Sequence, residues 1–350
     1  MQSARLILSA ATAAVAMLAG CADSPVRKYE APATLSPPPL KVPAASFTLA
    51  DFDANSTDHR RIRTAICREL DIAEADLTLA DLARVTRLDL FGQELEDLTP
   101  VAALTGLKRL SIHGNRISDL TPVEKLLALE VLEASKNRIS DLSPLRSLTR
   151  LRVLHLKQNA VTDVNPLSGL TALVSLDLER NRVQDLTALK GMTRLNWLAL
   201  GMNRVDRLEP LAGLTRLRHL YLERNKLGGA QLSPLKNLTA LRSLSLRGNQ
   251  VDDVAALQPM IHMNWLELDD NRVPSVAPLA GMTALEKLYL ENNRVTVLAP
   301  LVELKVLREL QARGNDISNE QSSLLIKALP DCRIHAGVFS TIPTRKPRNP

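Results

Sequence analysis

Aromatic residues and cysteines are scarce in this sequence. Phe, Trp and Tyr make up 3% of its 350 residues, which leaves little material for stacking platforms or a mixed aromatic core. Three cysteines are too few for a disulfide-rich scaffold, and no Cys/His group has zinc-site spacing, so we predict no metal and no cofactor. Acidic and basic residues are interspersed at a net charge of +6, so we expect no nucleic-acid partner.

Catalytic motifs are also missing. The sequence has no glycine-rich phosphate loop and no nucleophile elbow. His113, His155 and His219 fall on one predicted surface, but in repeats at least two apart. At the spacing of neighbouring strands that separation is about 10 Å or more, which is too far for one metal or one proton relay. We therefore predict no catalytic residues and no enzyme activity.

Leucine, close to one residue in five, is abundant and periodic. Segments such as Leu154-His-Leu156-Lys-Gln-Asn159 recur along the chain, with nine intervals of 22 residues and one of 24 that contains Gly228-Gly229. Gln93 occupies the Asn position of the first repeat. The later repeats place asparagine there, at Asn115, Asn137, Asn159, Asn181, Asn203, Asn225, Asn249, Asn271, Asn293 and Asn315. A repeat of this length predicts a solenoid.

Each part of the repeat has a physical reading. The L-x-L segment alternates with period two, which predicts a short strand with Leu inward. The Asn amide both donates and accepts, so stacked Asn side chains can form a ladder that satisfies backbone groups of adjacent coils. Leucines three residues apart predict tight 3₁₀ turns on the far side. Proline begins most of these turns, at Pro100, Pro122, Pro144, Pro166, Pro210, Pro234, Pro278 and Pro300.

The repeat resembles the leucine-rich repeat family, specifically the 22-residue type of SDS22-like proteins and bacterial internalins, over roughly residues 58–334. The resemblance implies an α/β fold: a right-handed horseshoe solenoid with a parallel sheet on the concave face and 3₁₀ turns or loops on the convex face. We expect a helical N-terminal cap in 47–85, about eleven coils in 86–317 and a C-terminal cap in 318–335, because a solenoid must cover its ends.

The two caps have their own signals. An amphipathic pattern predicts a helix over Asp58–Leu70, and Thr78 with Asp81 predicts a capped second helix over Leu79–Val85. At the far end, Ser318–Leu329 with the following Asp331-Cys332-Arg333-Ile334 resembles the helix-plus-strand cap that is common in bacterial repeat proteins. Cys67 and Cys332 would lie at opposite ends, roughly 50 Å apart, so we expect both to be buried and unpaired.

The N-terminal sequence indicates a targeting signal. Residues 1–20 read as a signal peptide, because their apolar run is too short to span a bilayer. The segment Leu18-Ala19-Gly20-Cys21 resembles the lipobox of bacterial lipoproteins, which implies lipid on Cys21, a membrane contact and an envelope location, with Ala22 favouring the outer membrane. The alternative is an ordinary signal peptide that a cysteine happens to follow. We expect a Pro-rich tether over 21–46 and a disordered basic tail over 336–350.

Aromatic residues concentrate on one predicted surface. Positions two, four and six before each Asn should point outward on the concave sheet, and they hold five of the nine aromatics, including both tryptophans. Exposed Trp and Tyr often anchor protein interfaces. We therefore predict that Trp197, Tyr221, Trp265 and Tyr289 contact a protein partner. The alternative is that the rings pack along the sheet as cross-strand stabilisers.

Charge is uneven on the same surface. Repeats five to ten place six carboxylates outward against two cations, which would steer a partner with basic and apolar groups there. Glu223, Glu267, Asp269 and Glu291 are the predicted polar contacts. No loop has the oxygen spacing of a calcium motif. A row of basic residues, the basic row, directly follows the Asn positions; it comprises Arg116, Arg138, Arg182, Arg204, Lys226, Arg272 and Arg294. It either binds an anion or is a solvated stripe whose charge is neutralised by nearby aspartates.

These features together predict a monomeric, membrane-anchored, non-enzymatic module that binds a protein on its concave face. One alternative is a structural envelope protein that contacts cell-wall glycan or glycolipid through the basic row. Another is an internalin-like adhesin on the cell surface, which would use the same concave face.

Overall fold

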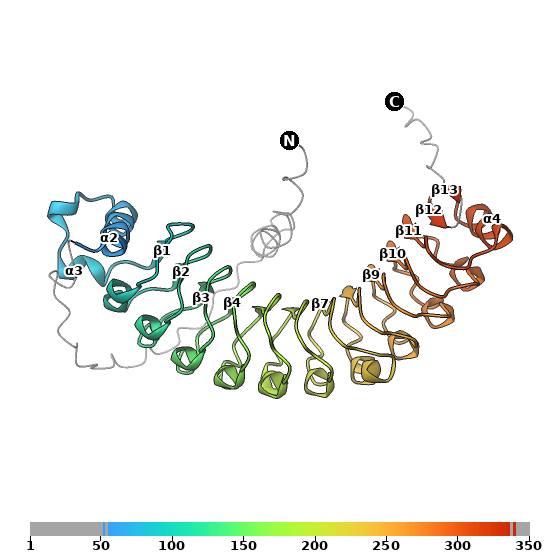
Figure 1. Cartoon of the computed structure of the whole chain (residues 1–350), viewed down its shortest axis with the longest axis horizontal. Helices are drawn as coiled ribbons and strands as arrows, with labels where there is room; N and C mark the ends of the chain where they lie inside the picture. The colour runs from blue at the N-terminus through green and yellow to red at the C-terminus, as the bar shows by residue number, and fades with distance from the viewer. Residues whose placement is uncertain (1–51, 53–54, 337–338, 341–350) are drawn as a thin grey trace, which may run out of the picture. The chain divides into compact units, whose positions relative to one another are not determined.

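The computed structural model describes residues 52, 55–336 and 339–340, which form a curved solenoid of short strands and 3₁₀ turns with a helical segment at each end (Figure 1). The predicted signal peptide, the tether with Cys21, and residues 341–350 lie outside the described residues.

The strands form a single open sheet on the inner side of the arc (Figure 1). β1 to β12 are parallel and follow one another in chain order, and β13 pairs antiparallel with β12. The register aligns the central leucines, as in Leu198 with Leu220. The strands are β1 (Arg87–Asp89), β2 (Arg109–Ser111), β3 (Val131–Glu133), β4 (Val153–His155), β5 (Ser175–Asp177), β6 (Trp197–Ala199), β7 (His219–Tyr221), β8 (Ser243–Ser245), β9 (Trp265–Glu267), β10 (Lys287–Tyr289), β11 (Glu309–Gln311), β12 (Arg333–Ala336) and β13 (Phe339–Ser340).

The convex side consists of 3₁₀ turns, which confirms the expected return segments. Most contain Pro in their first two positions, where the missing N–H is not needed. The longest turn follows Gly228-Gly229, the insertion of the 24-residue repeat. The turns are Thr99–Ala103, Thr121–Val123, Ser143–Leu145, Asn165–Leu167, Thr187–Gly191, Glu209–Leu211, Ala230–Asn237, Ala255–Leu257, Ala277–Leu279 and Ala299–Leu301; a further one, Glu74–Asp76, lies in the N-terminal cap.

The core is a continuous stack of leucines between sheet and turns. Leu198, Leu200 and Leu211, from one coil, are fully buried, as are the corresponding residues of the other central coils. Burying each such side chain stabilises the fold by about 1.5–3 kcal/mol relative to leaving it exposed. Because the inward positions are already filled by leucine, the large aromatics of the strands must lie on the opposite, concave face.

An asparagine ladder runs beside the core. In coil five, Asn181 donates from Nδ2 to the carbonyls of Leu156 (2.9 Å) and Leu178 (3.0 Å), and its Oδ1 accepts from the Val161 amide at 3.0 Å. The residue before each Asn has positive φ, as at Arg180 and Gly114. The left-handed turn swings the chain out of the strand and aims the amide at the neighbouring coil.

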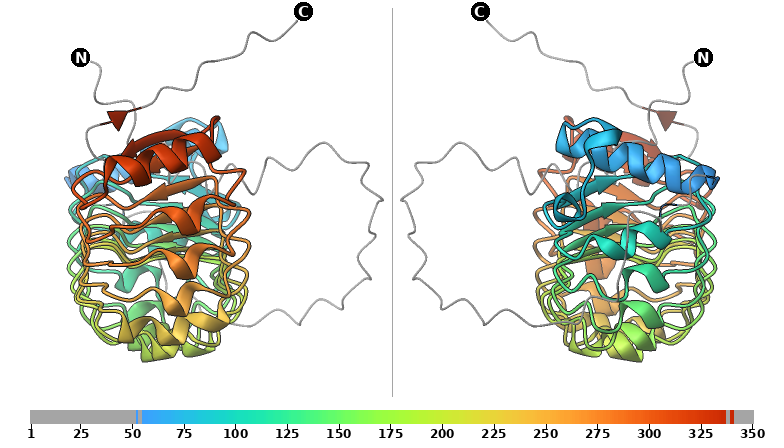
Figure 2. Two further views of the ribbon diagram at one scale, coloured as in Figure 1. Left: turned by 90° about the vertical axis from the view of Figure 1, so that its right-hand side faces the viewer. Right: turned by 90° about the vertical axis from the view of Figure 1, so that its left-hand side faces the viewer.

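The N-terminal cap covers the first coil. α2 (Thr57–Leu70) starts at Ser56, whose hydroxyl accepts from the His59 amide at 3.3 Å. It buries Ile62 and Ile66 and lies across the end of the solenoid (Figure 2). The short α3 (Leu79–Leu82) begins with the expected capping box of Thr78 and Asp81. It ends before the predicted Val85 because the chain must turn there to reach β1.

The C-terminal cap closes the opposite end. α4 (Asn319–Ala328) begins at Ser318, which accepts from the Gln321 amide at 3.2 Å, and it packs on the turn Ala299–Leu301. The predicted disordered tail was placed too early, because Ala336 ends β12 and Phe339–Ser340 forms β13. This strand provides the backbone partners that the edge of a parallel sheet would otherwise lack.

The two cap cysteines are buried as expected. Cys67 and Cys332 are each 3% exposed, lie in opposite caps and form no disulfide. Burial raises the pKa of both thiols, that of Cys332 to about 12, so neither is a thiolate near neutrality.

Candidate functional site: the aromatic row of the concave face

The concave aromatics form an unbroken row across the sheet, from β4 to β10. Ring centroids are 6.0 Å apart for His155 and Trp197, 5.7 Å for Trp197 and Tyr221, 6.2 Å for Tyr221 and Trp265, and 6.0 Å for Trp265 and Tyr289. All four pairs are tilted, the arrangement that aromatic pairs prefer to a face-to-face sandwich. The four predicted rings are half-buried, so each packs along the sheet and still presents surface.

Small residues let the row skip strands. His155 reaches Trp197 across β5, where Ser175 stands between them and shares a 3.1 Å hydrogen bond with His155 Nε2. Tyr221 reaches Trp265 across β8, whose concave positions hold Ser243 and Ser245. The row therefore depends on these serines as well as on the rings.

The same triplet of residues occurs twice in the row. Trp197 takes the first concave position of one coil, and Tyr221 and Glu223 take the second and third positions of the next coil. Trp265, Tyr289 and Glu291 repeat this arrangement three strands further on. The interplanar angles of the two Trp–Tyr pairs, 51° and 58°, are also alike. We call these the first and second Trp–Tyr–Glu triplets.

Carboxylates crowd around the first triplet. Glu223 leans over Gly201, where any Cβ would collide with its carboxylate. Its Oε2 is buried and has no hydrogen-bond partner among the described residues. Asp177, 6% exposed, accepts from the Glu179 amide at 2.9 Å, and Glu179 pairs with Lys157. Glu179 also lies 3.5 Å from Arg180, so both close cations pair with Glu179, and neither Asp177 nor Glu223 has an ion pair among the described residues.

Burial and mutual repulsion perturb these acids. Burial raises the pKa of Asp177 to about 7, with a further upward effect from Glu179 and Glu223. Burial also raises the pKa of Glu223, helped by Glu179 and Glu267. A low-dielectric setting disfavours the charged form unless a cation approaches. The site is therefore electrostatically unsatisfied in the free protein.

The second triplet has a similar setting. Glu267 accepts from the Ser245 hydroxyl at 2.7 Å and lies 3.8 Å from the Arg247 guanidinium. Burial raises the pKa of Asp269 to about 6, and Asp269 accepts from the Glu291 amide at 2.7 Å. Asp269 is only 7% exposed, so it offers less surface than the other predicted carboxylates.

The sequence placed Phe91, His113 and His155 on the concave surface but did not predict two of their ring contacts. His155 begins the row. It occupies the same repeat position as Tyr221 and Tyr289, and this shared position could have indicated the contact from the sequence. Phe91, at 63% exposure, stacks on His113 at 5.2 Å and 17° in the first two coils, separate from the row.

The predicted basic row is only partly paired. Arg116 lies 3.5 Å from Glu94, and Arg138 lies 3.8 Å from Glu96. The aspartates that follow the basic row have a structural role. The carboxylate of each accepts a hydrogen bond from the backbone amide two residues later, at the start of a 3₁₀ turn, as Asp141 accepts from the Ser143 amide at 2.8 Å. The aspartates with this bond are Asp97, Asp119, Asp141, Asp163, Asp185 and Asp253.

A second basic surface lies beside the starts of the strands. A shallow cleft of about 620 Å³ is lined by Arg150, Arg152, Arg194 and Arg216, with Glu130 as the one acid. All four arginines are exposed, and none has an ion pair within the described chain. They recur just after the 3₁₀ turns, a pattern that could have been read from the repeat alignment.

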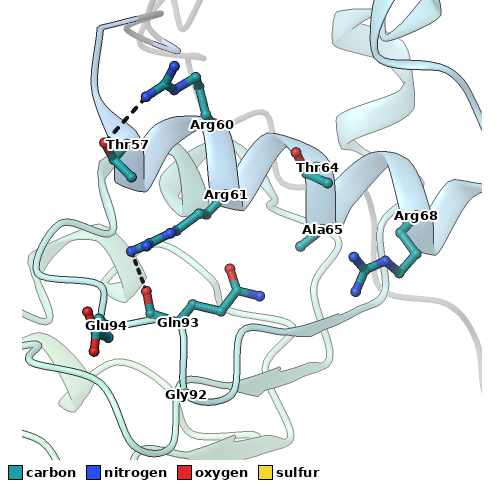
Figure 3. Close-up of a pocket in the computed structure, with 9 residues that line it drawn as sticks. All are labelled: Thr57, Arg60, Arg61, Thr64, Ala65, Arg68, Gly92, Gln93 and Glu94. Atoms are coloured by element: carbon teal, nitrogen blue, oxygen red, sulfur yellow. Dashed lines mark hydrogen bonds between the residues drawn. The ribbon is translucent and has the colours of Figure 1, made fainter.

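A cleft of about 600 Å³ separates α2 from the first coil (Figure 3). Arg61 crosses it and donates to the Gln93 carbonyl at 2.6 Å, while Arg60 turns to the Thr57 hydroxyl at 3.4 Å. Arg61 thereby ties the cap to the coil, so we assign this cleft to the capping interface.

Metal-binding groups and membrane-spanning helices were also considered among the described residues. Within them, no three His, Cys, Asp or Glu side chains are grouped so as to hold a metal ion. No helix of this described part has the length and apolar character needed to cross a bilayer.

Comparison with known proteins identifies the repeat. The sequence profile described as "Leucine Rich repeats (2 copies)" matches residues 127–168 and 149–191. No curated protein matches the chain in sequence.

Solved structures share the architecture. Internalin InlF from Listeria monocytogenes is 28% identical, with 78% of this chain and 87% of that chain covered and a TM-score of 0.68. Internalin C2 of the same species is 28% identical over 67% and 92% of the two chains, with a TM-score of 0.52. The ectodomain of the Arabidopsis thaliana receptor kinase GASSHO1/SCHENGEN3, in complex with CASPARIAN STRIP INTEGRITY FACTOR 2, is 19% identical over 74% and 36%, with a TM-score of 0.56. The chain thus has the fold of a leucine-rich repeat solenoid, and its structural neighbours include internalins.

Proposed function

We propose that this protein is a non-enzymatic binding module whose concave face holds a protein partner. The observation that carries the proposal is the unbroken row of rings from His155 to Tyr289, in which the four Trp and Tyr rings are half-buried. Rings that are already ordered by their neighbours lose little side-chain entropy when a partner covers them, and Trp and Tyr are the residues most often found as binding hot spots.

The shape and the relatives support the same function. A curved parallel sheet presents a broad surface with many side chains, which is how repeat proteins bind extended partners. The GASSHO1/SCHENGEN3 ectodomain, which shares this fold, was solved in complex with CASPARIAN STRIP INTEGRITY FACTOR 2. The packing of the rings along the sheet supports the stabilising alternative as well, and an experiment must separate the two roles.

The test is a cross-linked pull-down from the native cells with wild type and a Trp197→Ala/Trp265→Ala variant. We expect a partner that wild type recovers and the variant loses, since hot-spot truncation typically costs about 2 kcal/mol or more. Phe91→Ala is the matched control, because Phe91 is concave and exposed but lies outside the row. Equal recovery by all three proteins would assign the rings to packing alone.

We further propose that lipid on Cys21 anchors this module to a bacterial envelope membrane, with the outer membrane favoured and a Pro-rich tether between lipid and solenoid. The Leu18–Cys21 motif supports this proposal. Cys21→Ser should move the protein from the membrane fraction to the soluble fraction, and persistence in the membrane would contradict lipidation. Protease shaving of intact cells distinguishes a surface adhesin, which is cleaved, from a periplasmic module, which is protected.

A second candidate function is contact with a phosphate-bearing glycan or glycolipid. The cleft lined by Arg150, Arg152, Arg194 and Arg216 favours it, because its charge is uncompensated. Arg152→Glu/Arg194→Glu should then weaken binding to isolated lipopolysaccharide, and binding should fall steeply with salt. Arg182→Glu/Arg272→Glu, in the predicted basic row, serves as the comparison and shows which of the two basic surfaces is used.

A further inference from the structure

The two Trp–Tyr–Glu triplets lie at a defined separation. Their tryptophans, Trp197 in β6 and Trp265 in β9, are three strands apart in one continuous sheet. The ring centroids of Trp197 and Tyr221 are 5.7 Å apart and those of Tyr221 and Trp265 are 6.2 Å apart, so the two tryptophan rings lie at most about 12 Å from each other. The same chemistry is therefore offered twice along one face.

Each triplet has an acid that the protein itself leaves without a full partner. Glu223 Oε2 is buried and accepts no hydrogen bond among the described residues. The carboxylate of Glu291 has no ion pair within the described chain, and its amide, not its side chain, bonds to Asp269. A buried carboxylate oxygen without a partner is costly, and a cation from outside would remove that cost.

The rings beside these acids suit the same cation. Each Glu belongs to the same coil as a Tyr, and the Trp of the preceding coil packs against that Tyr. Aromatic faces attract ammonium and guanidinium groups, Arg more often than Lys, and their apolar surface covers the aliphatic part of a long basic side chain. A carboxylate next to a Trp–Tyr pair thus matches a basic side chain in both charge and shape.

We propose that each Trp–Tyr–Glu triplet receives one basic side chain, and that the partner presents two Lys or Arg residues about 12 Å apart on one segment. This inference rests on the proposed function, because it names the chemistry of the partner on the same face. In an extended segment, side chains at positions i and i+4 lie on one side and are about 13 Å apart, which fits the two triplets.

The pH dependence of binding provides a second readout. The groups that face Asp177 are His155, Lys157, Glu179 and Glu223, and those that face Asp269 are Arg247, Glu267 and Glu291. A basic side chain favours the ionised forms of these acids, whose pKa values are raised to about 7 for Asp177 and about 6 for Asp269. Binding therefore strengthens as the pH rises from 5.5 to 8. The pKa of His155 is lowered to about 4, so this histidine stays neutral throughout.

The experiment uses the full chain and a labelled nine-residue Ala/Ser peptide with Arg at its third and seventh positions. Fluorescence anisotropy compares it with a peptide that carries citrulline, the neutral isostere of arginine, at both positions. We expect the arginine peptide to bind at least about tenfold more tightly at pH 8, and the preference to shrink at pH 5.5. A peptide with arginines at adjacent positions should lose most of the preference, because it cannot reach both triplets.

Matched variants locate the effect. Glu223→Gln/Glu291→Gln should remove most of the preference for arginine, whereas Glu133→Gln should keep it, since Glu133 is a half-buried concave acid in β3 outside both triplets. Equal binding of the arginine and citrulline peptides, no binding of either up to millimolar concentration, or an equal loss in Glu133→Gln would each overturn the inference.

The outcomes of two experiments distinguish a failure of the proposed function from a failure of this inference. If Trp197→Ala/Trp265→Ala abolishes capture of the native partner while Glu223→Gln/Glu291→Gln leaves it intact, the concave face binds a partner that does not use the acids. If neither variant affects capture, both proposals are wrong.

Discussion

The buried carboxylate of Asp177 should destabilise the fold in a pH-dependent way. Burial raises its pKa from 3.8 to about 7, and one pKa unit corresponds to 1.36 kcal/mol, so the ionised group costs up to about 4 kcal/mol. Below pH 3.8 the group is protonated in both states and costs nothing. Between pH 3.8 and about 7 the unfolded chain ionises first, so stability falls as the pH rises, and above pH 7 the loss is complete.

Asp177→Asn removes the charge and retains an oxygen for the Glu179 amide. We expect the variant to be more stable than wild type by about 2–4 kcal/mol at pH 8 and by less than about 1 kcal/mol at pH 4. At roughly 2 °C per kcal/mol for a large domain, Tm should rise by about 4–8 °C at pH 8. The assay is thermal unfolding followed by circular dichroism for both proteins at both pH values. Taking the difference between them cancels the titration of every group that does not interact with Asp177.

Asp89→Asn is the matched control. Asp89 occupies the same repeat position in the first coil and accepts from the Phe91 amide at 3.0 Å, but it is exposed. Its substitution should leave Tm almost unchanged at either pH. If Asp177→Asn shifted Tm equally at pH 4 and pH 8, or destabilised the protein at pH 8, the charge of Asp177 would not be the cause and the reasoning would fail.

Three further predictions concern single residues. Asn181→Ala leaves the buried Val161 amide unpaired and removes one of the two donors to the carbonyls of Leu156 and Leu178, which keep their bonds to Asn159 and Asn203; denaturant unfolding should show a loss of about 1–3 kcal/mol, and a loss below about 0.5 kcal/mol would contradict the ladder's role. His155, whose pKa is lowered to about 4, contributes stability above its unfolded pKa of 6.5 that is lost as the pH falls towards 4; His155→Gln should therefore reduce the acid sensitivity of Tm, and an unchanged profile would rule this out. Gly106→Ala, whose Cβ would meet the Ala83 carbonyl oxygen at 2.5 Å, should cost about 1–3 kcal/mol by calorimetry, whereas Gly213→Ala, with open space around it, should cost almost nothing; equal effects would refute the collision.

The repeat made the architecture predictable at the level of individual residues. A leucine every second or third position leaves one way to bury the apolar surface of a coil, and the Asn position marks where the strand ends. Ser56, Thr78 and Ser318 are local caps whose bonds involve residues three positions away, so they too could be read from the sequence. The early end of α3 and the extra strand β13 could not, because both depend on where the neighbouring coil places its backbone.

The candidate site was only half predictable. Alternation in the strands determined that Trp197, Tyr221, Trp265 and Tyr289 share the concave face. Tertiary structure alone decided that they touch in a row, because the contacts run diagonally between strands and across the serines of β5 and β8.

Charge shows the same division. The sequence determined the sign of the central concave face by placing acids two or four residues before Asn181, Asn225, Asn271 and Asn293. Only the tertiary structure decided which acid is buried, since Glu223 can lean over a neighbouring coil only where that coil has Gly201. Repeat position is a local property of the chain, whereas burial and contact between coils are set by neighbours that the stacking of the solenoid brings together.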